Sequence, residues 1–147
     1  MEQNNLPKHV AIILDGNGRW AKRFSLPRSL GHYEGGFNLA KIADHANKRG
    51  IQILSVYAFS TENWKRPQEE IDYLMTKPLE MFDQYKDRIL KANIQIRFIG
   101  RKDRLSKEML ELMQEITDAT SAHDGMILNI CVDYGSYDDI HQAARHT

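Results

Sequence analysis

An apolar run leads directly into a glycine-containing turn in the segment Val10-Ala11-Ile12-Ile13-Leu14-Asp15-Gly16-Asn17-Gly18-Arg19-Trp20. Residues 10–14 are aliphatic, mostly β-branched and show no polar alternation, which is typical of a parallel strand that is buried on both faces. Two glycines two residues apart let the backbone take positive φ and come close to a ligand. The segment therefore predicts a strand that ends in a ligand-binding turn.

The turn combines groups that attract a diphosphate with one that repels it. Its backbone N–H groups form a concavity that suits an anion, and the Arg19 guanidinium matches phosphate oxygens. The Asp15 carboxylate would repel a phosphate charge about 4 Å away by roughly 4 kcal/mol at an effective dielectric near 20. A cation must therefore lie between them, and Mg²⁺ held by one carboxylate and substrate phosphates is a common solution. We interpret the turn as a magnesium–diphosphate cradle. The alternative is a plain connection, because Ala21 stands where the dinucleotide fingerprint has its third glycine.

Periodicity predicts the remaining elements. Three further segments rich in apolar residues predict strands at about 53–59, 94–99 and 126–132. Helical spacing predicts helices at about 36–49, 68–91, 106–122 and 138–146. Residues 24–30 are expected to form a loop, and Pro78 should kink or interrupt the second helix. The alternation indicates a single α/β domain, residues 1–147, with a doubly wound, mostly parallel sheet of four strands and helices on both faces.

A second polar cluster follows the second predicted strand and consists of Ser60-Thr61-Glu62-Asn63-Trp64-Lys65-Arg66. In doubly wound sheets, ligands bind outside the carboxyl ends of the strands. The cluster at 60–66 and the turn at 15–20 both fall there. We therefore expect them to contribute to one site.

Composition narrows the classes of protein. Twenty basic and twenty acidic residues cancel, which gives no indication of nucleic-acid binding. Between positions 8 and 28 the sequence has five basic residues and one acidic residue, Asp15. This local excess of positive charge favours an anionic ligand. Cys131 is the single cysteine, so no internal disulfide is possible; we expect it to be a core residue in a cytoplasmic protein. No apolar run reaches the ~20 residues of a membrane span, and the N-terminus lacks a signal peptide, so a soluble protein is expected.

The chain closely resembles the bacterial cis-prenyltransferases, the isoprenyl transferases typified by undecaprenyl diphosphate synthase. The resemblance covers the whole chain and rests on residues 9–22, Gly31-His32, residues 57–64 with Arg66-Pro67, residues 128–130 and Tyr134-Gly135. It implies condensation of isopentenyl diphosphate onto an allylic diphosphate, usually farnesyl diphosphate, with new Z double bonds and a requirement for Mg²⁺. It also implies polyprenyl diphosphate products that partition into the membrane as lipid carriers for cell-wall glycans, and a homodimer.

The resemblance assigns roles to individual residues. Asp15 corresponds to the essential Mg²⁺-linked carboxylate, and Asn63 to the residue assigned as proton acceptor. Substrate contacts correspond to Gly16, Asn17, Gly18, Arg19, Trp20, Arg28, His32, Ser60, Thr61, Glu62, Trp64 and Arg66. Because a neutral amide cannot hold an abstracted proton near neutral pH, we expect Asn63 to orient a proton relay to a phosphate oxygen or to Asp15.

The chain also departs from the family pattern. Family members continue into a segment with paired arginines that binds isopentenyl diphosphate, a glutamate that completes the Mg²⁺ site, and much of the dimer contact. Ser136 replaces the second glycine usual after Tyr134-Gly135. We therefore expect a truncated transferase with weak or no turnover, and the homodimer is in doubt. The alternative is a catalytically impaired module that only binds an allylic diphosphate or a protein partner.

Three other classes of protein fit less well. A phosphatase with an aspartyl nucleophile would prefer a second aspartate two residues after Asp15, where Asn17 stands. A zinc enzyme would need histidines at a ligand spacing such as His-Glu-x-x-His, and the histidines here, including His141 and His146, lack it. The non-catalytic subunit of heteromeric cis-prenyltransferases keeps the C-terminal arginine segment and loses the N-terminal motif, which is the opposite of the pattern here.

Overall fold

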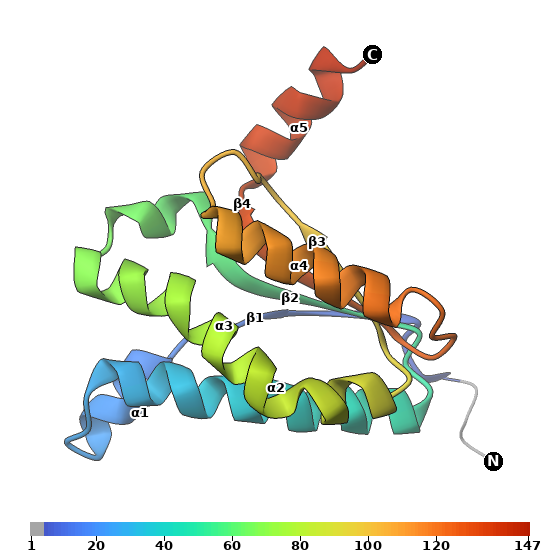
Figure 1. Cartoon of the computed structure of the whole chain (residues 1–147), viewed down its shortest axis with the longest axis horizontal. Coiled ribbons are helices and arrows are strands. Elements are labelled where there is room, and N and C mark those ends of the chain that lie inside the picture. Colours follow the sequence, from blue (N-terminus) through green and yellow to red (C-terminus); the bar gives the residue numbers. More distant parts are fainter. Residues whose placement is uncertain (1–4) are drawn as a thin grey trace.

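A computed structural model describes residues 5–147 and shows a parallel sheet flanked by helices (Figure 1). The sheet has the order β1-β2-β4-β3, and all three pairings are parallel. Its strands are β1 (His9–Ile13), β2 (Ile53–Ser60), β3 (Gln95–Ile99) and β4 (Ile127–Tyr134). All four strands were expected at these places, and the predicted parallel α/β fold is confirmed.

Helices follow the strands in alternation. They are α1 (Asn17–Arg23), α2 (Arg28–Arg49), the 3₁₀ helix η2 (Thr61–Lys65), α3 (Gln68–Lys91), α4 (Lys107–Thr120) and α5 (Ser136–Arg145). Figure 1 shows α5 projecting away from the body of the molecule towards the C-terminus.

One helix start was predicted wrongly, and one predicted interruption is absent. The helix expected from residue 36 begins at Arg28, so most of the predicted loop 24–30 is helical or flanks a helix. Pro27 stands at the N-cap with φ of −58°, and Gly31, Gly35 and Gly36 all lie inside α2. The sequence predicted a kink or an interruption at Pro78; α3 is not interrupted there, and the kink stays a prediction. Burial of Ile71 and Phe82 on either side of Pro78 accounts for this continuity.

The core lies on one face of the sheet. Leu54 and Val56 of β2 are fully buried there, in register with Leu128 and Ile130 of β4. Helices α2, α3 and α4 all contribute to the same cluster, through Ala43, Phe82, Leu112 and Ile116. These helices therefore hold the strand ends at fixed positions beneath the polar clusters.

The opposite face carries a partly exposed row of polar side chains. His9 Nε2 lies 2.8 Å from Ser55 Oγ, and Asn129 Nδ2 donates to the same oxygen at 3.1 Å. Ile13 on this face is 75% exposed, so the expectation that residues 10–14 are buried on both faces was wrong. β1 is an edge strand, and within residues 5–147 the helices that build the core cluster lie on the other face. Cys131 also lies on this face and is half-buried, and burial raises the pKa of its thiol.

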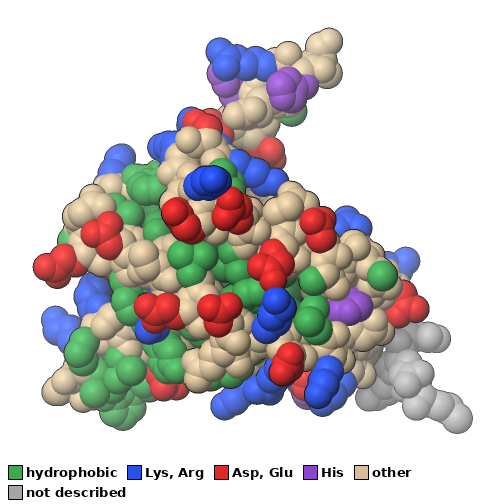
Figure 2. Space-filling view, viewed as in Figure 1, with side chains coloured by type: hydrophobic (Ala, Val, Ile, Leu, Met, Phe, Trp, Pro, Cys, Tyr) green, Lys and Arg blue, Asp and Glu red, His purple; other side chains and the backbone are tan. Residues whose placement is uncertain are grey.

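A group of apolar side chains is exposed where α1 joins α2. These are Trp20, Phe24, Leu26 and Leu30. Figure 2 shows hydrophobic side chains gathered at the corresponding lower left corner of the molecule. No helix in the described part of the chain is long and apolar enough to cross a membrane.

Candidate active site

A pocket of about 240 Å³ lies at the carboxyl ends of β1 and β2. Ten predicted site residues line it: Asp15, Gly16, Asn17, Gly18, Arg19, Arg28, His32, Ser60, Asn63 and Arg66. They come from the turn after β1, from α1, from the first turns of α2 and from the segment that follows β2. The structure thus brings the two polar clusters together at one edge of the sheet, as expected for a parallel α/β fold.

The turn after β1 presents a carboxylate at the rim of the pocket. Gly16 has φ of 93°, in the left-handed region, and caps α1. Its N–H donates to Asp15 Oδ1 at 2.6 Å, and Arg19 Nη2 donates to Asp15 Oδ2 at 2.9 Å. Both side chains of this ion pair are mostly exposed, so Asp15 is accessible to a ligand and the pair itself is weak.

Close packing of α1 against α2 sets the position of Arg28. A Cβ on Gly18 would lie 2.9 Å from Arg28 Cζ, and a Cβ on Gly31 would overlap the backbone carbonyl of Asn17. A Cβ on Gly35 would lie 2.6 Å from Asn17 Nδ2. The glycines therefore permit an approach between the two helices that places the Arg28 guanidinium over the first turn of α1.

Glu70 of α3 joins two arginines and a histidine behind the pocket. Its Oε1 accepts from Arg66 Nη1 at 2.6 Å and Arg28 Nη2 at 3.5 Å, and lies 2.9 Å from His32 Nε2. The Glu70 side chain is only 11% exposed. Burial alone would raise the pKa of its carboxyl, but hydrogen bonds from His32 and Arg66 and the charges of both arginines lower that pKa below its ordinary value of 4.5. The carboxylate thus aligns donors from α2 and from the segment before α3 towards the pocket.

The segment after β2 is fixed by a reciprocal cap. The Ser60 N–H donates to Asn63 Oδ1 at 2.9 Å, and the Ser60 side chain accepts from the Asn63 backbone. The cap uses the Asn63 carbonyl oxygen, which leaves its amide N–H groups as the atoms that can meet a ligand.

Four predicted contacts do not line this pocket. Trp20 packs against Phe24 with ring centroids 5.2 Å apart, and Glu62 is exposed. Thr61 packs against Gly135, because a Cβ there would lie 2.5 Å from Thr61 Oγ1. Trp64 points away from the pocket, and its Nε1 donates to Asp133 Oδ1 at 2.9 Å.

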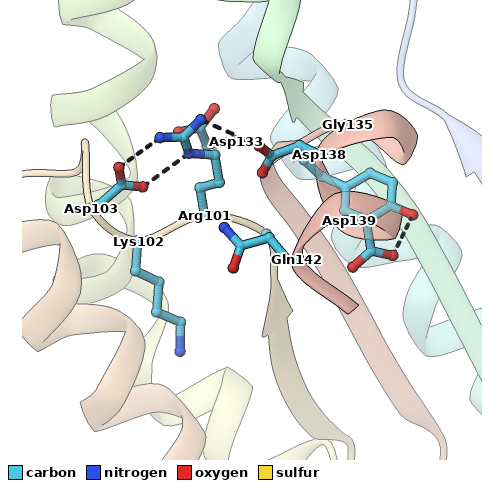
Figure 3. A pocket seen from close by; sticks show the side chains of 10 residues that line it. Arg101, Lys102, Asp103, Asp133, Gly135, Asp138, Asp139 and Gln142 are labelled. Carbon is cyan, nitrogen blue, oxygen red and sulfur yellow. Dashed lines mark hydrogen bonds and ion pairs between the residues drawn. The ribbon is translucent and has the colours of Figure 1, made fainter. Parts of the chain in front are cut away.

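A larger cavity of about 410 Å³ lies beside the ends of β3 and β4 (Figure 3). Asp103, Asp133, Asp138 and Asp139 line it, against Arg101 and Lys102. Arg101 is already bound by Asp103 at 2.7 Å and by Asp138 at 3.4 Å. An anion would be repelled there, whereas the smaller pocket has three arginines against one carboxylate. The smaller pocket is therefore the better anion site.

Comparison with known proteins identifies the family. The sequence profile described as "Putative undecaprenyl diphosphate synthase" matches residues 13–147. The chain belongs to this undecaprenyl diphosphate synthase family. An isoprenyl transferase of Bacillus cereus is 44% identical over 146 residues, which cover 99% of this chain and 57% of that relative. An isoprenyl transferase of Aquifex pyrophilus is 46% identical over 140 residues, which cover 95% of this chain and 61% of that relative.

Solved structures of similar proteins share the fold. Lavandulyl diphosphate synthase from Lavandula x intermedia, crystallised with dimethylallyl diphosphate, matches with a TM-score of 0.82 at 32% identity, over 95% of this chain and 60% of that protein. A "probable undecaprenyl diphosphate synthase" from Campylobacter jejuni matches with a TM-score of 0.73 at 30% identity, over 97% of this chain and 62% of that protein. The chain thus spans roughly three-fifths of the length of the relatives that it matches.

Sequence reasoning missed Glu70, although it is central to the site of this family member. Its only local signals were its place in the first turn of α3 and its spacing of four residues from Arg66. Both are ordinary features of a helix start. The contacts with Arg28 and His32 span about 40 positions of sequence, and only the fold shows them.

Replacing Glu70 with glutamine is expected to lower the free energy of unfolding by about 2 kcal/mol at pH 7. Folding lowers the pKa of Glu70. The stability that its carboxylate contributes is therefore fully present above pH 4.5, and it is lost as the pH falls through the lowered pKa of the folded state. The difference between the two proteins should therefore narrow on acidification below that pH. Urea unfolding at a series of pH values measures it. Glu80→Gln, which removes an exposed partner of Lys77 on the same helix, should cost under about 0.5 kcal/mol. A pH-independent difference for Glu70→Gln would contradict the account.

Proposed function

We propose that the pocket binds the diphosphate of an allylic substrate, and that the chain is a Z-type isoprenyl transferase. In this proposal it condenses isopentenyl diphosphate onto farnesyl diphosphate and forms a polyprenyl diphosphate lipid carrier. One observation carries the proposal: a chain of this family places three arginines, a histidine and one accessible carboxylate around a single pocket at the ends of β1 and β2.

The pocket offers separate surfaces to the two parts of such a substrate. Arg19, Arg28 and Arg66 present guanidinium groups that match phosphate oxygens. The first turn of α1 adds backbone N–H groups that have no partner within the helix. Leu14, Ala58 and Leu74 supply apolar lining for the adjoining isoprenoid carbons. Dimethylallyl diphosphate in the lavandulyl diphosphate synthase structure is an allylic diphosphate of the same class.

Asp15 is suited to bind Mg²⁺ only together with a substrate. No group of three or more histidine, cysteine or acidic side chains suitable for a metal occurs within residues 5–147. A single carboxylate beside a diphosphate nevertheless fits the way Mg²⁺ is usually held, with most ligands from water and phosphate. When bound, Mg²⁺ would neutralise charge that develops on the departing diphosphate. Asp15 would then act as the protein ligand, and Arg19 would be free to bind phosphate.

The remaining groups support departure of the diphosphate. As the allylic carbon–oxygen bond breaks, negative charge accumulates on the leaving group, and fixed arginine donors stabilise it without reorganisation. Asn63 donates from its amide nitrogen to a phosphate oxygen, because its carbonyl oxygen is used in the cap with Ser60. The proton released during condensation passes to a phosphate oxygen or to Asp15.

The alternative function is a module that binds an allylic diphosphate or a protein partner without turnover. A cytoplasmic location, a homodimer and transfer of the product to the membrane belong to the transferase proposal.

Incorporation of radiolabelled isopentenyl diphosphate, with farnesyl diphosphate and Mg²⁺, distinguishes the two functions. Label in long Z-prenyl products, lost in Asp15→Ala, would support the transferase. No label, combined with Mg²⁺-dependent binding of farnesyl diphosphate, would support the binding module. Absence of both labelling and binding would overturn the proposal.

A further inference from the structure

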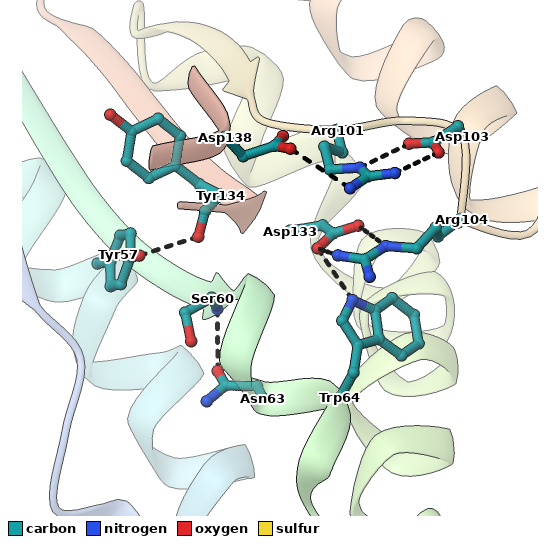
Figure 4. A network of polar contacts seen from close by, with 10 residues as sticks. All are labelled: Tyr57, Ser60, Asn63, Trp64, Arg101, Asp103, Arg104, Asp133, Tyr134 and Asp138. Carbon is teal, nitrogen blue, oxygen red and sulfur yellow. Dashed lines mark hydrogen bonds and ion pairs between the residues drawn. The ribbon is translucent and has the colours of Figure 1, made fainter. Parts of the chain in front are cut away.

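Three side chains from distant parts of the sequence meet behind the candidate active site (Figure 4). Asp133, near the end of β4, accepts from Trp64 Nε1 at 2.9 Å and from Arg104 Nη2 at 2.5 Å through Oδ1. Its Oδ2 accepts from Arg104 Nε at 2.9 Å. The Arg104 guanidinium also lies 5.2 Å from the centroid of the Trp64 ring. Each member of this Asp133–Arg104–Trp64 cluster therefore contacts both others.

The cluster is built around a buried charge. Asp133 is fully buried and its backbone has φ of 51°, which is uncommon for a residue other than glycine. Both carboxylate oxygens are satisfied by the fork of Arg104, a geometry that lysine cannot reproduce. A buried carboxylate with this pairing tolerates little movement of its partners, because an unpaired charge would remain in the protein interior.

The cluster reaches the pocket through η2. Trp64 is the residue after Asn63 in this 3₁₀ helix of five residues, and its ring also packs edge-on against Phe59 at 5.1 Å. The other end of η2 is held by the cap between Ser60 and Asn63 and by the packing of Thr61 against Gly135. A short 3₁₀ helix has weak internal hydrogen bonding, so its position depends on such anchors. The side chain of Trp64 thus fixes the end of η2 that lies farther from β2.

We propose that Asp133 and Arg104 are positioning residues of the diphosphate site. They hold Trp64, and through it they keep Asn63 and Ser60 directed at the pocket. The role in ligand binding rests on the proposed function. Neither residue lines the pocket itself, so both act through η2.

Hydrogen exchange measured by mass spectrometry on the unmodified chain and on Asp133→Asn tests the positioning without any ligand. Asparagine tolerates left-handed backbone and keeps one acceptor, so this change removes the charge and the bidentate pairing and preserves the local conformation. Amides of residues 61–66 should exchange about tenfold faster or more, while those of 53–57 and 127–131 are unchanged. Arg104→Lys should give a smaller increase at the same amides. Asp103→Asn is the matched control, because it removes an exposed aspartate of the loop that carries Arg104 and has no hydrogen bond to Trp64.

Titration with farnesyl diphosphate in the presence of Mg²⁺ measures the affinity of the ligand site. Asp133→Asn should weaken this affinity at least fivefold, and Asp103→Asn should leave it unchanged. Unchanged exchange at 61–66 in Asp133→Asn would overturn the positioning role. Faster exchange with unaltered affinity would overturn the link to the ligand site. If the unmodified chain does not bind farnesyl diphosphate, the proposed function fails, and the exchange result alone decides whether the cluster positions η2.

Discussion

Replacing Asp15 with alanine is expected to weaken the binding of farnesyl diphosphate only when Mg²⁺ is present. With Mg²⁺ present, the variant should bind about 100-fold more weakly, because the protein ligand that joins the cation to the pocket is lost. With the metal chelated, the variant should bind as tightly as the unmodified chain or more tightly. The Asp15 carboxylate then only repels the diphosphate and occupies Arg19, which it contacts at 2.9 Å.

Calorimetric titrations with farnesyl diphosphate, in Mg²⁺ and in chelator, measure the affinity of both proteins under both conditions. Asp44→Ala is the matched control, since Asp44 is an accessible carboxylate that forms an i,i+4 pair with Lys48, as Asp15 does with Arg19. Its affinity should be unchanged under both conditions. Equal weakening of the Asp15 variant with and without Mg²⁺ would contradict a role in metal binding.

Replacing Gly31 with alanine is expected to lower the free energy of unfolding by about 3 kcal/mol and to separate α1 from α2. Gly31 is buried in α2, and a Cβ there would overlap the backbone carbonyl of Asn17. Backbone atoms cannot rotate away as a side chain can, so α1 must move. The shift would displace Arg19 and Arg28, and binding of farnesyl diphosphate should weaken in parallel.

Gly36→Ala on the same helix separates this contact from the general effect of replacing a helical glycine. A Cβ at Gly36 would meet only the Met81 methyl group at 3.0 Å, at the end of a flexible side chain. The gain in helix propensity, of about 1 kcal/mol, should offset that contact. Urea unfolding followed by circular dichroism measures both variants. Similar losses for the two would show that close packing of α1 on α2 is not what Gly31 permits.

The sheet was predictable because its strands carry their signal locally. Residues 10–14 form an uninterrupted apolar run and residues 53–59 are apolar except for Ser55; both end in polar clusters, which parallel pairing places at one edge. Helix boundaries were less predictable. The helix predicted from residue 36 begins at Arg28, and close approach of α1 requires Gly31 and Gly35 inside it. At Pro78 packing outweighed the local cost of proline in a helix.

The candidate site was predictable where one segment carries the whole pattern, as at Asp15–Arg19. Glu70 was missed because Arg28 and His32 lie far from it in sequence, and Asp133 because Trp64 and Arg104 do. Trp64 was expected at the substrate, but the fold directs it towards Asp133. Whether Trp20, Thr61 and Glu62 contact a substrate stays a prediction, since they lie outside the pocket at the ends of β1 and β2.

Hydrogen exchange of the unmodified chain, with and without farnesyl diphosphate and Mg²⁺, tests most directly which cavity is the substrate site. The account predicts protection of residues 14–32 and 58–66, which surround the pocket with three arginines. Residues 100–103 and 133–142, around the larger acidic cavity, should be unchanged. Protection confined to the acidic cavity, or none in either region, would contradict the central claim that the pocket between β1 and β2 binds an allylic diphosphate.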